Sequence, residues 1–184
     1  MNFELQPTLT GALVQLRPLQ RDDFDALFAA ASDPLIWEVH PEPTRYMRDV
    51  FQKYFDSGIE SGGAFAVVDR ATGRIIGSSR YHNLQQGPPS EVEIGWTFLE
   101  RAYWGGRYNG EMKRLMIDHA LRSVDRVMFT AGQNNVRSRR ALEKIGARLV
   151  GTAERPAADG SPNVRYVITS LPHASASPKS HVKR

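Results

Sequence analysis

Apolar and polar residues follow strand-like or helix-like spacing along the chain up to about residue 171. Apolar residues that alternate with polar ones, or form a short apolar run, predict strands at 12–17, 64–69, 74–82, 91–98, 126–131, 147–154 and 164–171. Apolar residues that recur every three or four positions predict helices at 21–31, 44–57, 108–119 and 135–145, with a loop at 35–43. This order indicates the α/β class in a mixed α+β form: one domain built on a central, mixed, mostly antiparallel sheet of about seven strands with helices on both faces.

The predicted strand 91–98 has one apolar face and one face that carries carboxylates. Strict alternation places Ile94, Trp96 and Phe98 on the buried face, and Glu91 and Glu93 on the polar face. A carboxylate can accept the proton that an ammonium must lose before its nitrogen attacks, and a second carboxylate nearby raises the pKa of one partner. Glu93 is therefore a candidate general base, while the alternative is an exposed strand with ordinary surface glutamates.

The next segment, residues 103–111, reads YWGGRYNGE and leads into a predicted helix. A glycine-containing loop before a helix can aim backbone N–H groups and the positive end of the helix at a phosphate. Many Gly-Gly pairs only form turns, so this alternative stays open. Trp104 is expected to anchor the loop by being buried. The predicted helix has an apolar stripe formed by Tyr108, Met112, Leu115, Met116 and His119.

The predicted helix 135–145 combines a capping residue with a row of basic side chains. Asn135 is suited to cap the helix, and Ser138 lies one turn further on. Arg137, Arg140 and Lys144 fall at i, i+3 and i+7, so they share one face. This basic row suits contact with a phosphate group, and its alternative is an ordinary solvated face.

Composition narrows the remaining possibilities. The 184 residues fit one domain, expected at 1–172, followed by a disordered tail at 173–184. There is no cysteine, and five scattered histidines predict no metal site. No apolar run of about 18 residues and no signal peptide are visible, so a cytoplasmic protein without a membrane partner is expected. The net charge of +4 favours anionic partners only mildly, and nucleic acid is not expected.

The order of elements and four motifs resemble the GCN5-related N-acetyltransferase (GNAT) superfamily, and within it the branch of ribosomal-protein N-terminal acetyltransferases. The motifs are LRPL at 16–19, EIGW at 93–96, the 103–111 loop, and the Asn-x-x-Ser start of the helix at 135–146. Together they span nearly the whole chain.

The resemblance implies direct transfer of an acetyl group from acetyl-coenzyme A to a primary amine, such as a protein N-terminus or a small molecule, without a covalent enzyme intermediate. It implies catalytic roles for Glu93 and Ser138, and an acceptor pocket near Trp37, His40, Tyr81 and Glu91. It also implies contacts with acetyl-CoA by Thr97, Phe98, Leu99, Trp104, Gly105, Gly106, Arg107, Tyr108, Asn109, Gly110, Asn135, Arg140 and Lys144.

Two departures from the family pattern keep an alternative open. The loop usually reads Trp-Gly-x-Gly-Tyr-Ala, but Arg107 and Asn109 replace the second glycine and the alanine. Many members carry a tyrosine four residues after the serine, where this chain has Leu142. A non-catalytic acyl-CoA-binding or protein-interaction module therefore remains the alternative. The acceptor amine, the length of the acyl group and the choice between monomer and homodimer also stay open.

Overall fold

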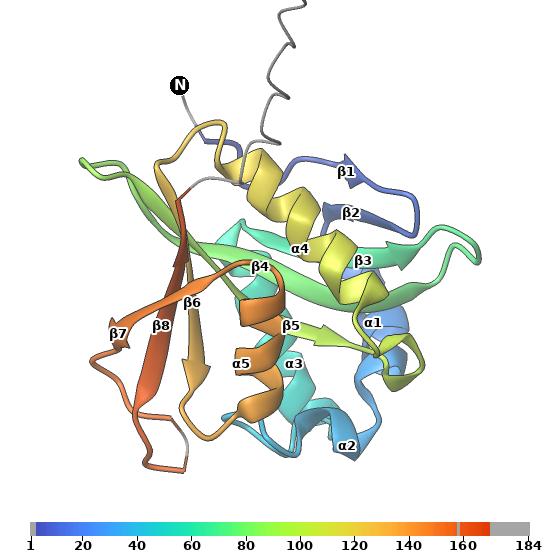
Figure 1. Cartoon of the computed structure of the whole chain (residues 1–184). Helices are drawn as coiled ribbons and strands as arrows, with labels where there is room; N and C mark the ends of the chain where they lie inside the picture. Colours follow the sequence, from blue (N-terminus) through green and yellow to red (C-terminus); the bar gives the residue numbers. More distant parts are fainter. Residues whose placement is uncertain (1–2, 158, 170–184) are drawn as a thin grey trace, which may run out of the picture.

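Eight strands form one sheet in the computed structural model, which describes residues 3–157 and 159–169 (Figure 1). Their order across the sheet is β1-β2-β3-β4-β5-β6-β8-β7, and within the described residues only β5 and β6 pair in parallel. The strands are β1 (Leu9–Thr10), β2 (Val14–Pro18), β3 (Ala64–Asp69), β4 (Ile75–Gln85), β5 (Glu91–Leu99), β6 (Arg126–Gly132), β7 (Arg148–Thr152) and β8 (Asn163–Ile168). The predicted class is confirmed, and the strand beyond the expected seven is the two-residue β1. The predicted tail at 173–184 lies outside the described residues.

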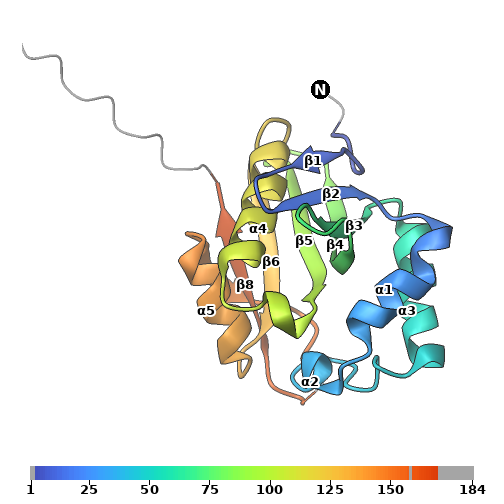
Figure 2. The ribbon, with the colours of Figure 1, turned by 90° about the vertical axis from the view of Figure 1, so that its right-hand side faces the viewer.

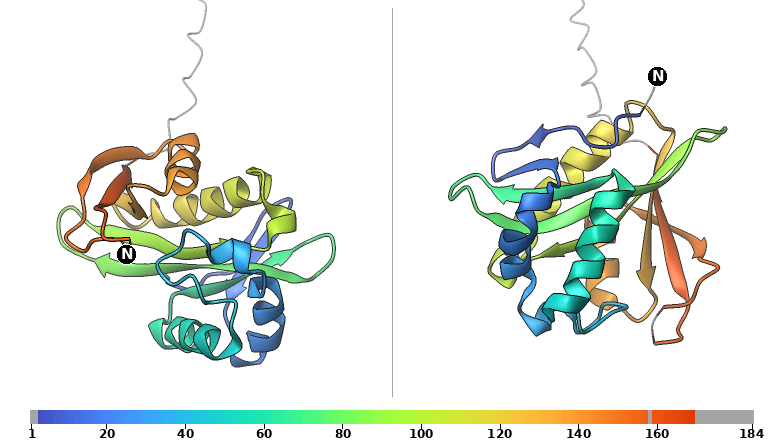
Figure 3. Two further views of the ribbon diagram at one scale, coloured as in Figure 1. Left: turned by 90° about the horizontal axis from the view of Figure 1, so that it is seen from below. Right: turned by 180° about the vertical axis from the view of Figure 1, so that it is seen from behind.

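Helices cover both faces of the sheet, as predicted (Figures 2 and 3). One face carries α1 (Phe24–Ala31), α2 (Pro34–Trp37) and α3 (Arg48–Ser61), and the other carries α4 (Arg107–Ala120) and α5 (Val136–Lys144). No helix in the described part of the chain is both long and apolar enough to cross a membrane.

Predicted boundaries on the first face were wrong at α2 and at both ends of α3, which ends at Ser61 instead of about residue 57. The expected loop at 35–43 begins with α2, because Pro34 is well placed in a first helical turn and the Asp33 carboxylate accepts a hydrogen bond from the Leu35 N–H. The expected helix from Thr44 begins at Arg48, because the Thr44 hydroxyl donates to the Glu42 carboxylate instead of capping the helix.

The two faces of β5 differ from those predicted from strict alternation. Arg80 pairs with Gly95 and Ser78 with Phe98, so two residues of β5, Trp96 and Thr97, lie opposite one residue of β4. This β-bulge inserts an extra residue and shifts the alternation. Ile94 therefore packs in the core under α4, whereas Phe98 packs in the core under α1–α3. Trp96, expected to be buried, has a φ of +54° and is 41% exposed.

A single carboxylate joins α4 to the N-terminal hairpin. Glu111, in the first part of α4, accepts hydrogen bonds from the backbone N–H groups of Ala12 (2.9 Å), Leu13 (2.7 Å) and Val14 (2.8 Å). Burial opposes ionisation of this carboxyl, but the three hydrogen bonds outweigh burial and lower the pKa of Glu111. Its stabilising effect is therefore present above the ordinary carboxyl pKa, and is lost as the pH falls through the lowered value.

We expect Glu111→Ala to lower the free energy of unfolding by about 1–2 kcal/mol at pH 7, because three backbone donors lose a charged acceptor. Urea unfolding measures this change. The matched control is Glu100→Ala, which removes an exposed ion pair with Arg74 and should cost less than about 1 kcal/mol. Equal losses in the two variants would contradict a special role for Glu111.

Candidate active site

The central feature of the molecule is a cavity where β5 and β6 separate. The two strands pair only at Glu91–Glu93 with Arg126–Met128, and beyond that point they diverge. The opening has a volume of ≈ 2370 Å³, well above the roughly 300–1,000 Å³ of a typical small-ligand pocket. Its lining comes mainly from 93–99 of β5, 129–132 of β6, one side of α4, α5 and the 38–45 segment. This space suits a long ligand together with a second molecule.

The loop before α4 can hold an anion at one end of the cavity. Gly105 and Gly106 have φ values of +106° and +104°, a backbone region that favours glycine. Gly106 precedes the helix, and the first N–H groups of a helix have no partner within it. Gly110 faces the cavity with no atom within 4 Å of where a side chain would begin, so a ligand can approach the backbone closely.

The predicted loop residues divide into two groups. The side of the loop that lines the cavity consists of Trp104, Gly105, Gly106, Asn109 and Gly110. Arg107 and Tyr108 do not line it, and the Tyr108 ring packs edge-on against Tyr103, with the ring centroids 4.9 Å apart. The loop therefore offers mainly glycines and backbone groups to a ligand.

Trp104 connects this loop to α5. The expectation that Trp104 is buried was wrong, because its side chain is 40% exposed. Its indole N–H donates to the Leu99 carbonyl at 2.9 Å, and the guanidinium of Arg137 lies 4.3 Å from the ring centroid. Arg137, Arg140 and Lys144 all line the cavity, so the predicted basic row faces it. Their positive charge supports anion binding at this end of the cavity.

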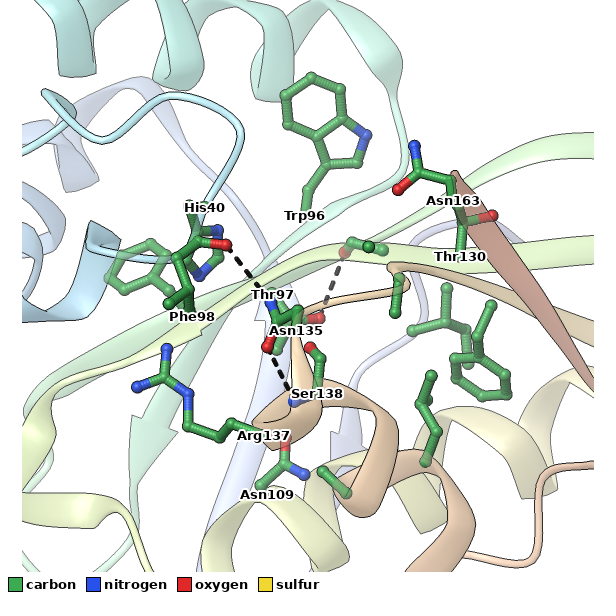
Figure 4. Close-up of a pocket in the computed structure, with 18 of the residues that line it drawn as sticks. His40, Trp96, Thr97, Phe98, Asn109, Thr130, Asn135, Arg137, Ser138 and Asn163 are labelled. Carbon is green, nitrogen blue, oxygen red and sulfur yellow. Dashed lines mark hydrogen bonds between the residues drawn. The ribbon is translucent and has the colours of Figure 1, made fainter. Parts of the chain in front are cut away.

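Asn135 connects α5 to the opposite wall of the cavity (Figure 4). Its side-chain carbonyl accepts the Ser138 backbone N–H at 3.0 Å, which is the predicted cap of α5. Its side-chain NH₂ donates to the Val39 carbonyl at 3.3 Å, on the 38–45 segment. Ser138 itself lines the cavity. The start of α5 and the 38–45 segment are therefore held together by one amide side chain.

Glu93 lies at the cavity wall beside a histidine that the sequence analysis did not select. One Glu93 oxygen is 3.9 Å from His82 Nε2, and the other accepts from the Asn83 side chain at 3.1 Å. A side chain on Gly95 would begin 2.7 Å from His82 Nε2, so the glycine makes room for the imidazole. Burial lowers the pKa of His82, against the attraction of Glu93. The imidazole is therefore neutral at pH 7, next to an available carboxylate.

Glu91 does not share this environment. Its buried carboxylate forms ion pairs with Arg126 at 2.8 Å and Arg165 at 3.5 Å, and it does not line the cavity. Two arginines neutralise its charge, so the expected influence of Glu91 on Glu93 has no support in this geometry. Glu91 ties the start of β5 to β6 and, across β6, to β8.

Trp37 and Tyr81 are core residues, although the family resemblance placed them near the acceptor. Both are 1% exposed, and neither lines the cavity. The Trp37 indole donates to the Ala31 carbonyl at 2.7 Å, and the Tyr81 hydroxyl to the Met116 carbonyl at 2.5 Å. His40 does line the cavity, and burial, with the charges of Arg45 and Arg137, lowers its pKa to about 4.

A buried lysine is the second site residue that the sequence analysis missed. Lys113 of α4 lines the cavity and donates to the hydroxyls of Thr97 at 2.6 Å and Ser79 at 3.3 Å. Burial lowers its pKa to about 7. Its spacing from Ile117 and Ala120, at i+4 and i+7, was a signal that it shares their buried face.

Comparison with known proteins assigns the class. The model of the acetyltransferase (GNAT) domain family matches residues 14–148, most of the chain. The chain therefore belongs to the GNAT acetyltransferase family, as its motifs predicted, and the protein is an N-acetyltransferase. No curated protein sequence matches it.

Solved structures show the same fold. A GCN5-related N-acetyltransferase from Brucella melitensis is 21% identical, with a TM-score of 0.78 over 89% of this chain and 79% of that chain. RimJ of Mycobacterium smegmatis, in complex with CoA-disulfide, is 19% identical, with a TM-score of 0.71 over 89% and 88%. A ribosomal-protein-S5-alanine acetyltransferase from Vibrio fischeri is 18% identical, with a TM-score of 0.65 over 89% and 97%.

Proposed function

We propose that this protein transfers the acetyl group of acetyl-CoA directly to a primary amine. The observation that carries the proposal is the cavity between β5 and β6, which has an anion-binding loop and basic helix at one end and an available carboxylate elsewhere in its wall. The glycine loop at 104–106 and the basic face of α5 would hold the phosphates of the coenzyme. When bound, acetyl-CoA supplies an activated acyl group as its thioester.

The remaining chemistry falls to residues of this chain. Glu93 would take the proton of the acceptor ammonium, directly or through water, so that the nitrogen can attack. Neutral His82, at 3.9 Å from Glu93, is placed to share that proton. Ser138 at the start of α5 would donate a hydrogen bond at the sulfur side of the cavity. Because Leu142 stands where many family members carry a tyrosine, no tyrosine can act as general acid at this position. Ser138 or solvent would therefore supply the proton to the leaving thiolate.

Isothermal titration with acetyl-CoA tests the proposal. We expect saturable binding, and at 100-fold excess over Kd a stabilisation of about 2.7 kcal/mol, or roughly 5–10 °C in melting temperature.

Arg137→Ala should raise the Kd for acetyl-CoA about tenfold, because it removes a cation at the phosphate end of the cavity and its contact with the Trp104 ring. Arg122→Ala, outside the cavity, is the control. The absence of both heat and stabilisation at millimolar ligand would contradict the proposal. Binding without release of free CoA against any amine would support the non-catalytic alternative.

A further inference from the structure

The 38–45 segment ends in Arg45, which pairs with no carboxylate of the described residues. The guanidinium carbon of Arg45 lies 5.5 Å from the Trp37 ring centroid, 5.3 Å from that of Tyr54 and 5.5 Å from that of Trp96. Within the described residues, this guanidinium forms no hydrogen bond and no ion pair. The Glu42 carboxylate attracts it, but accepts hydrogen bonds from Thr44 instead. Arg45 nevertheless lines the cavity.

A second arginine lies behind the same aromatic rings. Arg80 is 4% exposed, and its guanidinium carbon is 4.5 Å from the Trp96 ring centroid. It donates to the Ser57 hydroxyl at 2.9 Å and the Tyr54 carbonyl at 3.4 Å, and its Nε has no partner among residues 3–157 and 159–169. No carboxylate in the described part of the chain pairs with it.

This end of the cavity therefore carries uncompensated positive charge. Burial lowers the pKa of both guanidinium groups, and Arg45 lowers that of Arg80 further. Stacking on aromatic rings offsets only part of the cost of burying an unpaired cation. His40, in the same wall, is kept neutral partly by the charge of Arg45. A ligand that brings a negative charge would complete this arrangement.

Stacking leaves the edge of a guanidinium free, and that edge matches the two oxygens of a carboxylate. We propose that Arg45 binds a carboxylate of the acceptor, so that the acceptor is an amine that also carries a carboxylate. This inference rests on the proposed acetyl transfer. Trp96 is three residues from Glu93 along β5, or roughly 10 Å at the usual strand rise. The span favours a carboxylate several bonds from the amine, as in an ω-amino acid or a peptide with an acidic residue near its N-terminus.

Paired acceptors that differ only by a carboxylate and its carboxamide test this inference. The small-molecule arm uses glycine, β-alanine and 4-aminobutyrate with their amides, and the peptide arm uses Ala-Glu and Ala-Gln at the N-terminus of one pentapeptide amide. We expect the carboxylate member of at least one pair to have a kcat/KM about 10–100-fold higher. The arm in which this occurs identifies the source of the carboxylate.

Variants separate recognition from a structural role. Arg45→Gln should abolish the preference for carboxylate within each pair, and Arg45→Lys should keep part of it. Arg48→Gln is the matched control, since Arg48 also stacks on aromatic rings but pairs with Asp25 outside the cavity; it should leave the preference unchanged. An equal loss for both members of every pair in Arg45→Gln would overturn the inference, as would a wild-type enzyme that prefers no carboxylate.

A binding measurement covers the case in which no acceptor is turned over. The acetylated members of each pair are titrated into CoA-loaded protein, with the tryptophan fluorescence as the signal. The inference predicts tighter binding of the acid in at least one pair, lost in Arg45→Gln, and equal binding of acid and amide in every pair overturns it. Failure of the proposed function is distinguishable from failure of this inference, because it would appear as the absence of acetyl-CoA binding in the calorimeter.

Discussion

Replacement of Glu93 by glutamine is expected to lower kcat by roughly 10²–10⁴-fold at neutral pH, because the variant loses its general base. Glutamine keeps the shape of the side chain and an oxygen for the Asn83 hydrogen bond, but it cannot take up a proton. The Kd for acetyl-CoA should stay the same, since the Glu93 side chain contacts His82 and Asn83 rather than the 104–106 loop or α5. The defect should shrink as the pH rises toward the pKa of the acceptor, about 7.7–8.0 for an α-amine or about 10.4 for a lysine.

The pH profile of kcat, measured by the release of free CoA, tests whether Glu93 is the general base. Glu100→Gln, on the exposed pair with Arg74, is the matched control and should behave like the wild type. Wild-type turnover and an unchanged pH profile in Glu93→Gln would remove Glu93 from the mechanism. If His82→Gln lost activity in that case, the neutral imidazole would take over the role of base.

The second large expected effect is a dependence of the free energy of unfolding on pH that comes from Lys113. Its pKa is about 7 in the folded protein, against an ordinary value of 10.5, because burial disfavours the charged form. Between these values the unfolded chain binds more protons than the folded one, so the free energy of unfolding rises with pH. We expect a rise on the order of 2–4 kcal/mol between pH 7 and pH 10 from this group. Lys113→Met should lack that rise and should be more stable than the wild type at pH 7.

Urea unfolding at pH 7, 8, 9 and 10 compares the wild type with Lys113→Met. Lys53→Met replaces an exposed lysine of α3 and should keep the wild-type dependence on pH. The difference between wild type and Lys113→Met isolates one lysine from other groups that titrate in this range. Parallel curves for these two proteins would show that Lys113 keeps an ordinary pKa.

Much of the fold follows from local sequence patterns. The strand at 64–69 has the predicted bounds, and β5, β6 and α5 differ from prediction by only a residue or so at their ends. Apolar spacing is enough for these elements because each is long enough to repeat its pattern or, as in β3, forms a continuous apolar run that is buried on both faces. β1 and α2 were missed because they contain two and four residues, too few to repeat a pattern.

The site was less predictable, because it depends on contacts between distant residues. Glu93, Ser138 and the basic row of α5 were selected from motifs, and the structure brings them to one cavity. His82 and Lys113 were missed, since neither belongs to a local motif and each gains its properties from burial. The bulge at 96–97 was missed because strict alternation is the default, although Gly95, an isolated glycine inside the strand pattern directly before the extra residue, was a signal for it.

That bulge costs stability, but it shapes one end of the cavity. A bulky residue with positive φ, such as Trp96, costs on the order of 1–3 kcal/mol. Removing it would leave an ordinary ladder with Thr97 opposite Ser79, and Ile94 and Phe98 would still face the cores they now occupy. The fold therefore does not need this residue, whereas both arginines at this end of the cavity stack on its ring. A thermostable variant obtained by smoothing β5 would keep its architecture and lose the surface that we propose receives the acceptor.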